Sequence, residues 1–280
     1  MKKLRTMWFR LLLLGIIAQM FVGCRKAATE IPFYLKCDSA RVAPTTLGIA
    51  NSGIYGLYIT IENDIRGTWQ MPFKMPILKD GLKRMVVSPV VKINNLSTRF
   101  LAYPFYSTKL VDVNMVREKT LDTVFDFEYA TGITMLANEE MESATNFSAS
   151  TKSSLSRNGN GSMLMKADFS SVDSSATAYY FKQLPFNFEK TTFLEFDYYM
   201  PEGILAPALA YTDINGNPKV MFGESYLNKN SSWVHVYYNY TYLIDRIGKS
   251  GLYTPIFILT MPKGSINATA YLDNVRILEK

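Results

Sequence analysis

Histidine and cysteine are scarce in this sequence, and their scarcity excludes several kinds of chemistry. The 280 residues contain one histidine, His235, and two cysteines, Cys24 and Cys37. A zinc site needs several His or Cys ligands, and a Ser-His-Asp triad could be built only around His235, which no G-x-S-x-G elbow accompanies. Glycine fingerprints for nucleotides are also missing from the sequence. We therefore expect no catalytic residue and no organic cofactor.

Long hydrophobic runs are missing after Cys24, while a short one precedes it. Four basic residues lie in positions 1–10, and an apolar run over 11–22 ends at Gly23 and Cys24. This order is typical of a secretory signal rather than a spanning helix. Cys24 after Phe-Val-Gly resembles the lipobox of bacterial lipoproteins, which implies a signal peptide over 1–23, an acylated Cys24 and a membrane partner. The alternative is a signal without a lipid.

The excess of basic over acidic residues is also small once that segment is set aside. The formal net charge is +6, but four of the 30 Lys and Arg lie in residues 1–23 with no acidic residue, which leaves 26 against 24 Asp and Glu. A nucleic-acid partner needs a clustered basic stripe, which residues 24–280 lack. The sequence predicts no nucleic-acid partner.

Disulfides are excluded as well if Cys24 carries lipid, because Cys37 is then the only thiol. Cys37 follows Phe33 and Leu35 in an alternating segment, which predicts a buried thiol. Stability must come from packing.

Residues typical of β-structure are abundant, and we expect an all-β chain. Aromatic and β-branched residues recur between turn clusters, and helical periodicity is not sustained. Residues 54–61 alternate as a half-buried strand, and residues 63–67 turn it back into 68–71. With expected strands at 84–87, 98–102 and 110–116, these suit an immunoglobulin-like sandwich over 46–128, preceded by a tether and first strand over 24–45.

The second half predicts a jelly-roll β-sandwich over 129–280. Residues 144–162 have a loop composition of Ser, Thr, Asn and Gly. Eight strands are then expected, at 162–167, 179–182, 193–200, 205–212, 219–222, 233–240, 255–261 and 269–278.

Parts of both halves resemble known families. The segments Pro-Phe-Lys-Met-Pro-Ile-Leu at 72–78, Thr-Arg at 98–99 and Tyr-Pro-Phe-Tyr at 103–106 resemble a pattern in Bacteroidota lipoproteins of unassigned function. In that group an immunoglobulin-like domain precedes a jelly roll. Residues 232–236 and 271–277 resemble the late strands of galactose-binding-like carbohydrate modules. The resemblances imply an outer-membrane lipoprotein, on its periplasmic face or at the cell surface.

One expected strand carries a candidate glycan site. Residues 234, 236 and 238 share the parity expected to face the core, which turns the other parity outward: Trp233, His235, Tyr237 and Asn239. Aromatic faces stack against sugar rings, and His and Asn bind hydroxyls. The alternative is that Trp233 lies beneath a loop and the tyrosines line a covered face.

Acidic residues suggest two further sites. Glu195 and Asp197 alternate on the polar face of strand 193–200, at a spacing that glycosidases use, although solvated carboxylates on such a face are common. Carbohydrate modules of this shape often hold a structural ion, so the resemblance implies calcium at Asp273 with Glu139, Glu140 or Glu142. Otherwise Asp273 lies at a polar kink.

The sequence as a whole predicts a lipid-anchored, non-catalytic binding protein of the cell envelope whose jelly roll contacts polysaccharide. A structural protein that docks onto another envelope protein is the alternative. A jelly-roll glycosidase or lyase is a third possibility.

Overall fold

The computed structural model describes residues 31–42, 53–96, 98–142, 145–150, 153–157, 159, 161–168, 177–260 and 267–280. Cys24 and the expected signal peptide lie outside these residues. In the described part of the chain, no helix has the length and apolar character needed to cross a bilayer. Strands dominate that part, with the short helix α2 (Thr241–Ile247) near the end. The prediction of an all-β fold of two β-sandwiches is confirmed.

The first sandwich packs two layers of short strands around one core. One layer has the order β4-β3-β6-β7, with β8 also paired to β6, and the other contains β5-β1-β9 and β10-β2. The bounds are β1 (Phe33–Cys37), β2 (Ala40–Val42), β3 (Ile54–Ile61), β4 (Asp64–Gln70), β5 (Phe73–Ile77), β6 (Gly81–Lys92), β7 (Phe100–Ala102), β8 (Lys109–Met115), β9 (Thr120–Asp122) and β10 (Phe125–Phe127).

Alternation along β3 builds this core as expected, because Leu57, Ile59 and Ile61 are buried in it. Cys37 is buried in the same cluster, which confirms its predicted burial. The predicted turn over 63–67 is wrong, since β4 already begins at Asp64. Glu62 and Asn63 make the turn with φ of 49° and 66°, the left-handed pair that a two-residue hairpin needs.

The second sandwich is a larger pair of sheets. The β17 sheet has the order β13-β14-β23-β17-β21, with β11 on β23, and the β18 sheet has the order β12-β15-β22-β18-β19, with β16 on β22 and β20 on β18. The bounds are β11 (Thr134–Glu139), β12 (Ser148–Ala149), β13 (Ser153–Arg157), β14 (Met163–Asp168), β15 (Thr177–Tyr180), β16 (Leu184–Phe186), β17 (Thr192–Glu202), β18 (Ile204–Thr212), β19 (Pro218–Phe222), β20 (Leu227–Asn228), β21 (Val234–Asn239), β22 (Gly251–Thr260) and β23 (Asn267–Glu279).

All eight strands expected in this half are present, although their ends differ by a few residues. The expectation that 144–162 is entirely loop is wrong, because β12 and β13 lie within it. β13 pairs antiparallel with β14 as the last strand of its sheet, where a polar, serine-rich sequence tolerates solvent.

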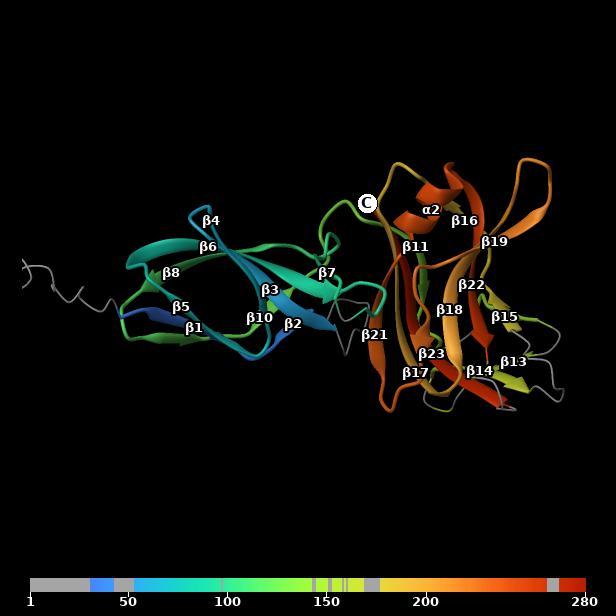
Figure 1. Ribbon diagram of the computed structural model, residues 1–280, viewed down its shortest axis with the longest axis horizontal. Helices are drawn as coiled ribbons and strands as arrows, with labels where there is room; N and C mark the ends of the chain where they lie inside the picture. Colours follow the sequence, from blue (N-terminus) through green and yellow to red (C-terminus); the bar gives the residue numbers. More distant parts are fainter. Residues whose placement is uncertain are drawn as a thin grey trace, which may run out of the picture.

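The two sandwiches lie one beyond the other along the long axis, with β21 on the side of the second sandwich that faces the first (Figure 1). Ile93, just after β6, forms a parallel bridge with Tyr237 of β21. Phe193, Tyr237 and Leu278 of the second sandwich belong to the hydrophobic cluster of the first. The junction is therefore a packed interface.

Candidate functional site

The outward face of the β17 sheet carries four rows of side chains that run across β21, β17 and β23. Inward residues of the same strands, such as Phe196, Val236 and Leu272, form the sandwich core. Strand register defines the rows from the free end of the sheet toward the first sandwich. They are the ring row (Trp233, Tyr199, Tyr271), the carboxylate row (His235, Asp197, Asp273) and two junction rows (Tyr237, Glu195, Arg276; Asn239, Phe193, Leu278).

The ring row is the most open of the four. Tyr199 stacks on Tyr271 with centroids 5.4 Å apart and planes 21° apart, and it lies 6.2 Å from the Trp233 ring. Trp233 is 37% exposed, and both tyrosines are partly buried. Three adjacent rings on a sheet surface offer apolar π faces that a sugar can cover.

The carboxylate row is a hydrogen-bonded polar cluster beside the rings. Nδ1 of His235 lies 2.7 Å from Asp197 Oδ1, and Asn274 Nδ2 donates to Asp197 Oδ2 at 2.8 Å. The backbone N–H of Asn274, whose φ is 50°, donates to Asp273 Oδ1 at 2.8 Å. This local bend turns Asp273 and Asn274 together toward Asp197.

Burial of Asp273 raises the pKa of its carboxyl above the usual value, and the nearby charges of Asp197 and Glu142 act in the same direction, whereas the hydrogen bond from the Asn274 N–H and the charge of Arg276 act against them. Asp273 is thus a carboxylate in a partly desolvated place with two acidic neighbours. It disfavours any additional negative charge in its surroundings.

The third row is closed by the first sandwich. Glu195 is fully buried, and it accepts hydrogen bonds from the phenols of Tyr103 and Tyr129, each at 2.5 Å. The phenol oxygens of Tyr106 and Tyr237 lie 2.9 Å apart beside it. Burial, with the charge of Glu195 adding to it, raises the pKa of Tyr103 well above the ordinary value.

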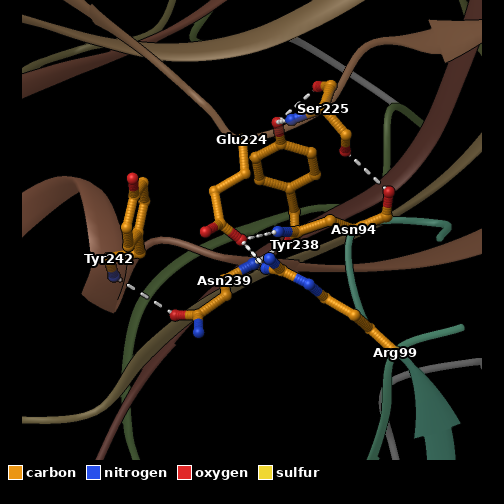
Figure 2. A network of polar contacts seen from close by, with 7 residues as sticks. All are labelled: Asn94, Arg99, Glu224, Ser225, Tyr238, Asn239 and Tyr242. Atoms are coloured by element: carbon orange, nitrogen blue, oxygen red, sulfur yellow. Dashed lines mark hydrogen bonds and ion pairs between the residues drawn. The ribbon is translucent and has the colours of Figure 1, made fainter.

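Figure 2 shows how the turn after β6 is held at the same junction. Glu224 accepts hydrogen bonds from Arg99 and from Asn94 Nδ2, the latter at 2.9 Å. Ser225 Oγ donates to the Asn94 carbonyl at 2.8 Å, and the Asn239 N–H donates to Asn94 Oδ1 at 2.7 Å. One asparagine of the first sandwich therefore binds three residues, in two segments of the second sandwich, through its backbone and side chain.

The parity predicted for β21 is correct, but the openness predicted for its outward face is wrong at two positions. Tyr237 and His235 are only 1% and 7% exposed. Asn239 is partly buried, with its backbone bonded to Asn94, and only Trp233 is exposed. The reason at Tyr237 and Asn239 is the first sandwich, which covers them with residues more than a hundred positions earlier in the chain, and Gly53 lies against His235.

The expectation of an exposed carboxylate pair is likewise wrong at Glu195, which is buried between two tyrosines. Asp197 is engaged by His235 and Asn274. The two carboxylates therefore do not form the open pair that the alternation of the strand suggested.

Tyr199 and Tyr271 were missed by the sequence interpretation. Each lies two residues from a residue that it did single out, Asp197 and Asp273, on the same face of the strand. Their shared parity could have indicated from the sequence that both tyrosines point outward. The strand register that places both beside Trp233 could not be predicted from the sequence.

The calcium prediction stays a prediction. Glu139 is buried and accepts hydrogen bonds from the backbone and side chain of Asn146, while Glu140 accepts one from Asn138. Among the described residues, no three His, Cys, Asp or Glu side chains are grouped as metal ligands.

These features define a class, a two-sandwich protein with an aromatic surface on its second domain. No protein-family model and no curated protein matches the chain.

Similar solved structures cover about half of the chain. The CBM22-1 xylan-binding domain from Paenibacillus barcinonensis Xyn10C is 11% identical over 54% of this chain and 97% of its own, with a TM-score of 0.42. A family 11 carbohydrate-binding module of the cellulosomal cellulase Lic26A-Cel5E of Clostridium thermocellum is 13% identical over 53% and 95%, with a TM-score of 0.38. Similarities this low carry no inference about what this chain binds.

Proposed function

We propose that this chain is a non-catalytic glycan-binding protein and that the ring row is its contact surface. The observation that carries the proposal is a contiguous set of three rings: Tyr199 on β17, Tyr271 on β23 and Trp233 directly before β21. Sugar rings present apolar C–H faces to such a surface, and the adjacent carboxylate row accepts hydrogen bonds from hydroxyl groups.

Several features support binding rather than turnover. Glu195 is buried and Asp197 is hydrogen-bonded on both oxygens, so neither is placed as a general acid beside the rings. His235 Nδ1 is occupied by Asp197, and its side chain is fully buried. The polar groups hold the strands in register, whereas the rings face outward.

The test uses purified residues 25–280 in affinity gels that contain xylan, mannan, galactan or β-glucan. At least one polysaccharide should retard the protein, and Trp233→Ala should weaken that retention by about ten-fold or more, since stacking on a large ring is lost. Tyr226→Ala is the matched control, because Tyr226 is a 61% exposed aromatic residue of the same sandwich outside the ring row.

Two results would count against the proposal. Folded protein that none of the polysaccharides retards has no glycan site of the proposed kind. Shortening of a polysaccharide, abolished in Asp197→Asn, would instead identify an enzyme.

We further propose that the protein is held at the cell envelope by lipid on Cys24. The signal-like order of residues 1–24 supports this. Growth with a palmitate analogue should label the full chain but not Cys24→Ser. An unlabelled full chain recovered from the cytosol would contradict it.

A further inference from the structure

We infer that the ring row selects uncharged or amine-bearing glycans and excludes acidic ones, because the carboxylate row lies alongside it. This inference rests on the proposed glycan binding and names the ligand class of that same surface. Two carboxylates, Asp197 and Asp273, face each other across β17 and β23. Each is two residues along its strand from a ring of the ring row, Tyr199 or Tyr271.

Strand geometry places the carboxylates within reach of a bound sugar. Residues two apart on one face of a strand are separated by about 7 Å, and neighbouring strands by about 5 Å. The substituents of a sugar stacked on Tyr199 or Tyr271 therefore approach the carboxylate row.

Three carboxylates and two arginines lie at this row. Asp197 and Asp273 are joined by Glu142, whose charge also acts on Asp273, while the charge of Arg276, buried in the adjacent junction row, acts on Asp273 in the opposite direction. Glu142 itself lies 3.6 Å from Arg157, which leaves Asp197 and Asp273 as the carboxylates nearest the rings. On the other side of the ring row, the exposed Lys166 and Glu202 both pair with Thr269, so that end carries one charge of each sign.

His235 is the basic side chain in the row, and its Nδ1 is committed to Asp197. Its buried Nε2 has no hydrogen-bond partner in the described part of the chain. The row therefore offers a ligand its carboxylate acceptors, while the one polar nitrogen without a partner is buried. Hydroxyl and ammonium groups can donate to the acceptors, whereas a sugar carboxylate would meet like charge.

The experiment compares each polysaccharide with its own oxidised form. Glucan, mannan and galactan are paired with derivatives in which the C6 hydroxyl is a carboxylate, and chitosan supplies an amine-bearing chain. Residues 25–280 should bind a neutral chain at least about ten-fold more tightly than its oxidised form at low salt, because like charges a few ångströms apart repel. The difference should shrink in 1 M salt, where the Debye length is about 3 Å.

Asp273→Asn tests the residue assignment. It should narrow the difference between neutral and oxidised chains, while Asp245→Asn, which removes an exposed carboxylate on α2, should leave the difference unchanged. If Asp273→Asn does not fold, the salt dependence of the unmodified protein decides.

The outcomes separate the two proposals. Equal, Trp233-dependent binding of neutral and oxidised chains would overturn the charge selectivity and leave glycan binding in place. A preference for neutral chains that salt does not reduce would also overturn it. Failure to bind any chain, charged or neutral, would remove the proposed function itself.

Discussion

Glu195 shows how much one buried side chain contributes to the junction. Its two carboxylate oxygens accept hydrogen bonds from the phenols of Tyr103 and Tyr129, which belong to segments before the second sandwich. Hydrogen bonds to a charged group are stronger than neutral ones, and leaving a buried carboxylate with one donor fewer is costly.

The first prediction at this scale concerns Tyr103→Phe, which removes one of these donors without changing the ring. It should lower the free energy of unfolding by about 1.5–3 kcal/mol in urea denaturation. Tyr58→Phe, at a partly exposed tyrosine of the same sandwich, is the control and should cost little. Equal losses for the two variants would argue against a carboxylate buried at the junction.

The second prediction concerns alkaline pH. Burial raises the pKa of Tyr103, Tyr106 and Tyr237 well above the ordinary value of a phenol. The folded state therefore keeps protons that the unfolded state releases, so the contribution of these tyrosines to stability is complete below pH about 10 and is lost as the pH rises above it. In a phenolate absorbance titration, these residues should ionise only on unfolding. Ionisation of all tyrosines near pH 10 in folded protein would contradict this.

At the residue scale, the sequence predicted the side of the strand to which each side chain points, but not which outward side chains the first sandwich would bury. Alternation correctly turned Trp233 outward and Val236 inward. It did not predict that Tyr237 would be buried, since its cover comes from Tyr103 and Tyr106, far away in sequence. Which outward residues stay exposed depends on domain packing, which periodicity does not encode.

At the scale of elements, the turn after β6 joins the two sandwiches through side-chain and backbone hydrogen bonds. Asn94 and Asn95 both have φ of 55°, a left-handed conformation that Asn tolerates better than most residues. The turn presents Asn94 to Glu224, Ser225 and Asn239 of the second sandwich (Figure 2).

A pair of substitutions at Asn94 separates conformation from contact. Asn94→Gly loses the side-chain bonds but keeps the left-handed backbone, whereas Asn94→Ala loses both. Both should destabilise the protein, and alanine should cost about 1 kcal/mol more than glycine. Thermal unfolding followed by circular dichroism measures the difference. Greater stability for alanine would contradict the turn geometry.

Strand prediction succeeded where alternation was strong, as in β3 and β17. It failed for β9 and β12, because a segment of two or three residues is too short to show a periodicity, and it also missed the longer β11 and β13. The fold class was therefore predictable from the sequence, while the register that assembles the ring row was not.

At the scale of the whole molecule, the junction joins the two sandwiches. It contains a shared hydrophobic cluster, a buried carboxylate and the Asn94 contacts. Elements that share so much buried surface unfold together.

Calorimetry of residues 25–280 should accordingly show a single unfolding transition. Glu195→Ala, which leaves the phenols of Tyr103 and Tyr129 without their acceptor, should lower its midpoint or split it in two. Two resolved transitions in the unmodified protein would mean that the junction does not couple the sandwiches.

The central claim is that a glycan covers the ring row, and tryptophan fluorescence tests it most directly. In residues 25–280 only Trp69 and Trp233 remain, so Trp69→Phe leaves Trp233 as the sole reporter. With a polysaccharide that retards the protein in gels, Trp233 emission should shift to the blue and be protected from acrylamide. Undiminished quenching of Trp233 while the polysaccharide is bound would contradict the account.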